Sequence, residues 1–169
     1  IRQVKTLIEQ GNAQCILGNH ELNLLIHSKR EGNGWFFCSL HEDDHKPFAS
    51  HPASVHDHHW ILDFLSHLPL VLTSAHLKIV HACWDQQAID RLHTVHMASL
   101  KEMYDAFNQH TEAYIQHSGI AERAQQEQCQ FTTQLKNPNT APPFLNHLAQ
   151  RDLLEQMQNP IKVLTSGAE

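Results

Sequence analysis

Short apolar runs that end in polar turns alternate along this chain with segments of helical periodicity. Apolar side chains recur at helical spacing in residues 4–8, and Gly11 then ends the segment. The next run, residues 13–17 (AQCIL), is short and apolar and is closed by Gly18. Such a run is typical of a buried parallel strand. Helices that alternate with strands of this kind predict an α/β fold.

The remaining elements follow from the same patterns. Apolar spacing and breakers predict further helices at residues 20–29, 56–67, 85–92, 95–117 and 144–158. Two apolar runs separated by two residues predict a hairpin of residues 70–74 and 77–82, and residues 161–164 (IKVL) fit one more strand or a helix end. Residues 31–55 mix Gly, Pro, Asp and His without clear periodicity, so we expect a long, substrate-facing loop there.

Composition narrows the class of protein. A chain of 169 residues favours a single domain, and a net charge of -6 disfavours a nucleic-acid partner, because duplex binding needs a basic surface. The 4 cysteines form no CxxC pair, which favours reduced thiols and a cytoplasmic location. No apolar stretch reaches the roughly 20 residues that cross a bilayer, so we expect no membrane partner.

The turn after the first apolar run carries residue types suited to phosphate chemistry. In residues 18–21 (GNHE), Gly18 permits a sharp turn and Asn19 offers a neutral oxygen to a cation. His20 can donate a proton or a hydrogen bond to a phosphate oxygen. An ordinary strand-to-helix turn with Asn19 as the helix cap would use the same residue types, so these four residues alone leave both interpretations open.

A second segment favours the functional interpretation of the GNHE turn over the ordinary helix cap. His81 follows the run LKIV in HLKIVHACWD, so it also lies at the end of a predicted strand. From there its imidazole can reach a metal that Asn19 holds on a neighbouring strand.

Residues 18–21 (GNHE) and 80–85 (VHACWD), in this order and spacing, resemble two signature blocks of the calcineurin-like metallophosphoesterases. The chain is similar to the bacterial members described as serine/threonine-phosphatase-like or dinucleoside-tetraphosphatase-like. Residues 68–70 and 161–164 support the likeness, which covers most of the chain and is weak between residues 95 and 160.

The resemblance implies a fold, a cofactor and residue roles. It implies a partial calcineurin-like β-sandwich flanked by helices, with a helical insertion, and two divalent metal ions of which Mn, Fe and Zn all suit the ligands. Asn19 and His81 would be ligands of the second metal, and His20 would contact the phosphate and assist the leaving group. Glu21 would belong to the motif without binding metal. Leu17 stands where the family's eukaryotic phosphatases have arginine, which argues against a phosphoprotein preference.

The family's Asp-x-His, GDxxDRG and late Gly-His blocks are not found in these residues. We therefore expect residues 1–169 to be one metallophosphoesterase domain truncated at both ends, and inactive alone because two ligands hold a metal weakly. The substrate is left open among a phosphoprotein, a dinucleoside polyphosphate and a phosphomonoester.

Two rival functions are a non-catalytic His-rich metal-binding protein, suggested by 16 His, and a degenerate phosphatase-like interaction domain. Within the chain, Cys83 has no recognisable base nearby, so we interpret it as a packing residue rather than a nucleophile. The cluster in residues 56–59 (HDHH) lacks the i, i+4 spacing of helical zinc motifs, so we interpret it as a solvated helix face.

Overall fold

Helices make up most of the molecule. The computed structural model describes residues 1–37 and 52–167, and these residues are 60% helix and 3% strand. The helices are α1 (Arg2–Glu9), α2 (Asn19–Leu25), α3 (Gly34–Phe37), α4 (Val55–Ser66), α5 (Gln86–His93), α6 (Leu100–His117), α7 (Ile120–Leu135), α8 (Asn146–Met157) and α9 (Pro160–Ser166). The strands are β1 (Leu72–Thr73) and β2 (Lys78–Ile79).

The predicted α/β fold with a partial β-sandwich is wrong. In the described part of the chain, β1 and β2 form the whole sheet, an antiparallel pair that aligns Leu72 with Ile79. Residues 13–17 form no strand, although the Leu17 N–H donates to the Pro69 carbonyl at 2.9 Å. An apolar run becomes part of a sheet only where a second strand lies beside it, and the described residues place none there.

Residues 161–164 belong to a helix rather than a strand. Asn159 caps α9 by accepting a hydrogen bond from the Ile161 N–H, and Pro160 occupies the first turn. Both are favourable helix-start residues, because the cap satisfies a free amide and proline has none to satisfy.

Other local predictions are confirmed. The predicted hairpin forms, with shorter strands than expected. The Asp85 carboxylate accepts from the Ala88 N–H at 3.0 Å and caps α5. At the start of α4, Ser54 and Asp57 make a capping box that was not predicted. The predicted loop of residues 31–55 contains α3, and its residues 38–51 lie outside the described part.

Helix α9 lies between two hydrophobic clusters and joins them. Its Ile161 packs in the first cluster with Leu17 and the inner faces of α2 and α4. Its Val163 and Leu164 pack in the second cluster against α5. All three side chains are almost fully buried, so α9 fixes the position of α2 relative to α5.

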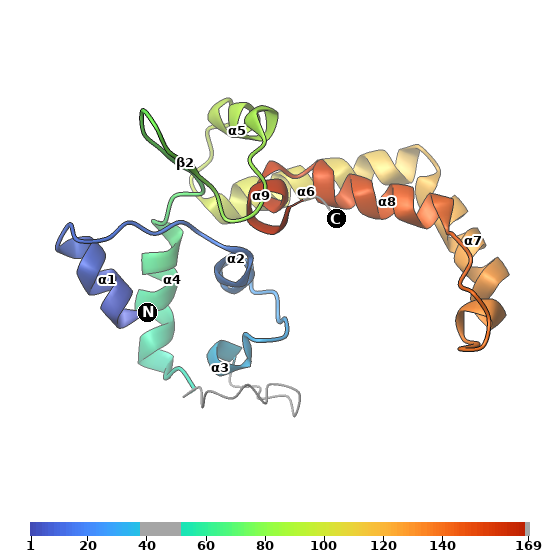
Figure 1. The fold of residues 1–169 in the computed structure, drawn as a ribbon, viewed down its shortest axis with the longest axis horizontal. Coiled ribbons are helices and arrows are strands. Elements are labelled where there is room, and N and C mark those ends of the chain that lie inside the picture. The colour runs from blue at the N-terminus through green and yellow to red at the C-terminus, as the bar shows by residue number, and fades with distance from the viewer. Residues whose placement is uncertain (38–51, 168–169) are drawn as a thin grey trace.

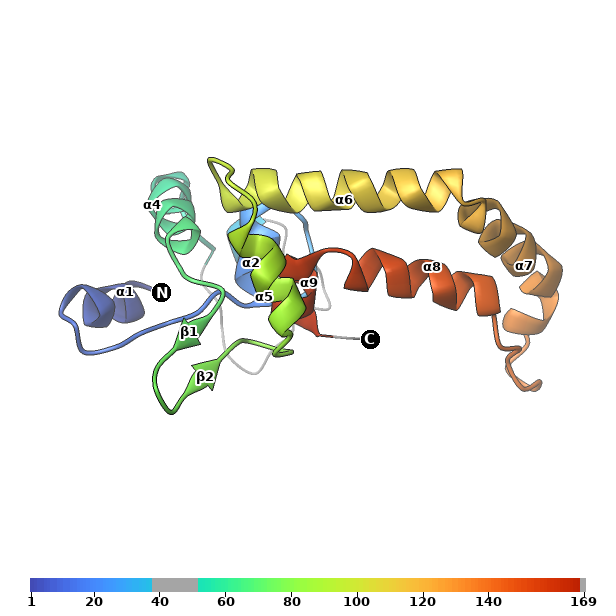
Figure 2. The ribbon, with the colours of Figure 1, turned by 90° about the horizontal axis from the view of Figure 1, so that it is seen from above.

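Helices α6, α7 and α8 form an arm that extends away from these clusters, with α6 and α8 side by side (Figures 1 and 2). The Glu127 carboxylate on α7 accepts from the His147 and Leu148 N–H groups at 2.8 and 3.0 Å, which satisfies the first turn of α8. Among residues 1–37 and 52–167, no helix combines the length and the apolar character needed to span a membrane.

Candidate functional site

The two sequence blocks meet at Gly18. A Cβ atom placed on Gly18 would lie 2.8 Å from Cε1 and 2.9 Å from Nδ1 of His81, and 2.8 Å from Oε2 of Glu21. The His81 ring and the Glu21 carboxylate therefore rest against the Gly18 backbone, directly before Asn19 and α2. His81 thus contacts the GNHE turn at Gly18, without the two parallel strands that were expected to bring His81 and Asn19 to one metal.

His20 is held by a buried asparagine from the following loop. Asn33, 2% exposed, donates from Nδ2 to the His20 carbonyl at 3.0 Å, and its Oδ1 lies 3.3 Å from His20 Nδ1. A carbonyl only accepts, so the Asn33 amide must turn Nδ2 toward it and Oδ1 toward the ring. Because Oδ1 also only accepts, Nδ1 of His20 carries the hydrogen. The Nε2 atom is then the ring nitrogen available to a ligand.

His20 and Asn19 line a pocket of about 600 Å³ between α2, the segment after it, α6, α8 and α9. The other lining residues are mostly polar: Leu22, Asn23, Arg30, Glu31, Tyr104, Gln156, Lys162 and Ser166. His81 is not among them. The structure thus places Asn19 and His20 in the pocket and His81 behind Gly18, at the start of α2.

Two cations give this pocket its electrostatic character. The Lys162 ammonium group donates to the Glu155 carbonyl at 3.0 Å and lies 5.7 Å from the centre of the Tyr104 ring. Burial lowers the pKa of Lys162 from its ordinary value, Glu155 opposes this shift, and the positive charge of Arg30 adds to it. The positive charges of Arg30 and Lys162 therefore repel each other, and this repulsion favours the binding of an anion between them.

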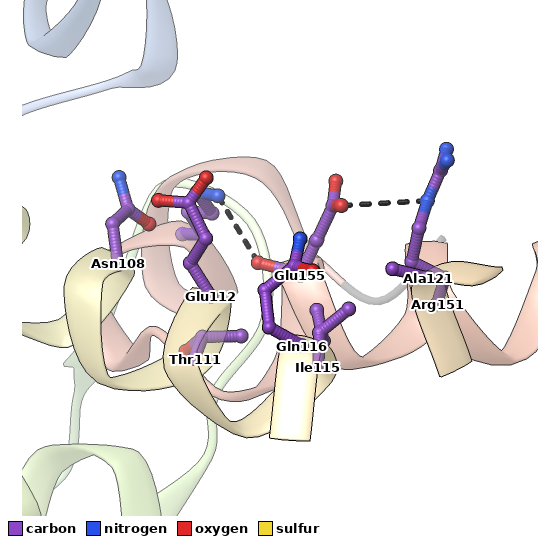
Figure 3. Close-up of a pocket in the computed structure, with 9 residues that line it drawn as sticks. Asn108, Thr111, Glu112, Ile115, Gln116, Ala121, Arg151 and Glu155 are labelled. Atoms are coloured by element: carbon purple, nitrogen blue, oxygen red, sulfur yellow. Dashed lines mark hydrogen bonds and ion pairs between the residues drawn. The ribbon is translucent and has the colours of Figure 1, made fainter. Parts of the chain in front are cut away.

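A second pocket, of about 380 Å³, lies along the arm and shares Lys162 with the first (Figure 3). Its carboxylates, Glu112 and Glu155, accompany Arg151, which pairs with Glu155 at 3.4 Å and with Asp152 at 2.7 Å. The charges of this pocket are largely compensated within the protein. It therefore has less to offer an anionic ligand than the His20 pocket.

No protein-family model, curated protein or solved structure matches this chain. The resemblance to calcineurin-like metallophosphoesterases accordingly stays a prediction based on GNHE and VHACWD. An assignment of function therefore has to rest on the two sequence blocks and on their contact at Gly18.

The described residues fit a divalent metal only in part. They contain no group of three or more His, Cys, Asp or Glu side chains arranged to hold an ion. Asn19 and His81 offer one neutral oxygen and one imidazole nitrogen, and Asn19 Oδ1 already accepts from the His20 N–H at 3.0 Å. Protein metal sites of this kind use three or four ligands, so these two are an incomplete set.

The HDHH cluster has structural roles. Its Asp57 carboxylate accepts from Ser54 and from Trp60 Nε1, and these bonds, the Ser54 hydroxyl first, hold the pKa of Asp57 well below its usual range. His58 stacks on Phe36 with ring centroids 4.3 Å apart. His56 and His59 are exposed, as expected for a solvated face. Cys83 packs against the second hydrophobic cluster, which agrees with its interpretation as a packing residue.

Sequence reasoning missed Asn33, Arg30, Lys162 and Tyr104. The Gly-Asn-Gly sequence around Asn33 reads as a simple helix breaker, and its buried amide becomes visible only in three dimensions. Lys162 lies within the apolar run 161–164, and its position there as a lone cation is the signal that could have identified it.

Replacing Gly18 with alanine should separate His81 from the turn without unfolding the protein. Gly18 has φ -101°, which alanine adopts freely, and the atoms nearest to the added Cβ belong to the movable side chains of His81 and Glu21. We expect a stability change below about 1 kcal/mol. We also expect the NMR signals of the His81 ring to shift, while those of exposed His76 at the hairpin tip stay in place. Unchanged His81 signals would contradict the contact at Gly18.

Proposed function

We propose that this chain serves in metal-dependent hydrolysis of phosphate esters, with the ester phosphate bound in the His20 pocket. The observation that supports this most is the meeting of the two blocks, in which the His81 ring lies against Gly18 at the turn that carries Asn19 and His20. Residues distant in sequence thereby share one location. The cations Arg30 and Lys162 in the same pocket suit a phosphorylated substrate.

His20 is the candidate catalytic residue. Its Nδ1–H is directed to Asn33, so Nε2 is the atom that exchanges a proton with the substrate. In the protonated ring, Nε2–H can pass its proton to the departing oxygen as the phosphorus–oxygen bond breaks. Asn33 acts through His20 and is a positioning residue.

Asn19 and His81 are the candidate metal ligands. Mn, Fe and Zn all accept oxygen and imidazole donors, and a bound divalent ion would supply charge neutralisation and an acidic water. Because these two side chains are an incomplete set, hydrolysis also needs metal ligands beyond the described residues.

Metal titration of ligand variants tests this assignment. We expect Asn19→Ala and His81→Ala each to weaken Mn²⁺ binding by at least about tenfold, since each removes a donor. In the protein as its gene encodes it, hydrolysis of p-nitrophenyl phosphate should fall in parallel, and excess Mn²⁺ should partly restore it by mass action.

His76→Ala, at the exposed hairpin tip, is the matched control and should change neither the Mn²⁺ affinity nor the rate of hydrolysis. Unchanged Mn²⁺ affinity in both ligand variants would remove Asn19 and His81 from the metal site. Absence of hydrolysis in the encoded protein, tested on activated and unactivated esters with Mn²⁺, Fe²⁺ and Zn²⁺, would reject the function.

A further inference from the structure

Arg30 lines the His20 pocket without a charged partner among the described residues. Its guanidinium makes no ion pair or side-chain hydrogen bond with residues 1–37 or 52–167. The neighbouring Glu31 carboxylate also lines the pocket and likewise forms no ion pair within these ranges. Within residues 1–37 and 52–167, no side chain therefore competes with a ligand for the five donors of Arg30.

Lys162 is the second cation, and it is held more firmly. It sits on α9 between buried Ile161 and Val163, and the cap at Asn159 fixes the start of that helix. Its ammonium group uses one of three donors on the Glu155 carbonyl, which leaves two for a ligand. Its lowered pKa reflects burial first, and the charge of Arg30 lowers it further.

These two cations are supplied by different parts of the chain from His20. Arg30 follows α2 and Lys162 lies on α9, whereas His20 lies in the first turn of α2. The pocket volume of about 600 Å³ exceeds what one phosphate group needs. A ligand whose single phosphate faces His20 would leave exposed Arg30 and the half-buried Lys162 ammonium group without an anionic partner, which is unfavourable for the half-buried charge.

We propose that Arg30 and Lys162 bind a second anionic group of the substrate, adjacent to the phosphate that faces His20. This inference rests on the proposed phosphoester function and narrows its substrate class to molecules with two neighbouring anionic groups. Pyrophosphate is the simplest probe of that class. Charge-assisted bonds from arginine and lysine to phosphate oxygens are among the strongest hydrogen bonds in proteins. Pyrophosphate should therefore bind much more tightly than a single phosphate.

Calorimetric titration of residues 1–169 with pyrophosphate and with orthophosphate, without metal, tests the proposal. We expect pyrophosphate to bind at least about tenfold more tightly. Arg30→Gln and Lys162→Met should each weaken pyrophosphate binding by about tenfold or more and leave orthophosphate binding less affected. Lys29→Gln changes the net charge as Arg30→Gln does, at an exposed neighbouring position outside the pocket, and should stay within twofold of the unmodified protein.

Equal affinity for the two anions in the unmodified protein would overturn the proposal. So would an equal loss in Lys29→Gln, which would indicate general charge attraction rather than a site. Arg30 is exposed, so its variant remains informative if Lys162→Met folds poorly. Binding is measured without turnover, so the two proposals can fail separately. If the encoded protein binds pyrophosphate selectively but hydrolyses no ester, the hydrolytic function is refuted and the binding site is retained.

Discussion

His20→Ala is expected to lower phosphate-ester hydrolysis by the encoded protein by roughly 10² to 10⁴ in rate, the usual contribution of a positioned acid or base. Metal content should stay unchanged, because His20 Nδ1 is directed to Asn33 and the proposed ligands are Asn19 and His81. Rates and bound metal, measured on the same preparation, check both parts.

Two esters separate the possible roles of His20. An activated phenolate leaves with little protonation, whereas an alkoxide needs a proton in the transition state, so the loss in His20→Ala should be smaller for p-nitrophenyl phosphate than for an alkyl phosphate. Loss of metal in the variant would make His20 a ligand, and an equal loss on both esters would remove its role at the leaving group. Asn33→Leu is the companion variant and should reduce the rate less, with metal retained.

Asn159→Leu is expected to destabilise the protein by about 3 kcal/mol, since it leaves buried polar groups without partners. Asn159 is fully buried, and its Nδ2 donates to the Tyr104 carbonyl at 3.2 Å and to Asn108 Oδ1 at 3.0 Å. Its Oδ1 accepts from the Ile161 N–H at 3.0 Å and so caps α9. Chemical denaturation monitored by circular dichroism measures the change.

Asn146→Leu is the matched control, because Asn146 is exposed at the start of α8 and should tolerate the change within about 0.5 kcal/mol. Asn159→Ser keeps an acceptor for the cap but loses the two donated bonds to α6, so it should recover about 1 kcal/mol of the loss. Equal stability of Asn159→Leu and the unmodified protein would show that α9 is held by its apolar contacts alone.

Local signals in the sequence predicted most of the helices, because a helix start depends on neighbouring residues. Helix α7 was not predicted, and its N-cap residue, Gly119, makes no side-chain cap hydrogen bond that could have signalled the start. Asp85 and Ser54 cap the helices they precede, and each cap depends only on the residues that follow it. The apolar run 13–17 gave the opposite outcome. Its pattern indicates burial correctly, since Leu17 is fully buried, but membership of a sheet depends on a partner that the run itself does not encode.

For the short run 161–164, the sequence left a strand and a helix end open for a related reason, and the structure has the helix. Apolar runs of this length are equally compatible with a buried strand and with one turn of a buried helix, and the Asn159-Pro160 start decides for the helix. In the candidate site, Asn19 and His20 were proposed from one sequence block and His81 from another, and their roles stay predictions. Arg30 and Lys162 come together only through the packing of α9, so no local pattern could pair them.

The hydrogen bond from the Ala82 N–H to the Leu164 carbonyl has a kinetic consequence. It joins the residue after His81 to the last helix, so the chain between residues 82 and 164 must close into a loop before this bond forms. Closure of a long loop loses entropy that later contacts must offset, and synthesis delivers the N-terminal residues first. On the ribosome, the GNHE turn can therefore form early, but His81 acquires its native support only after α9 has emerged.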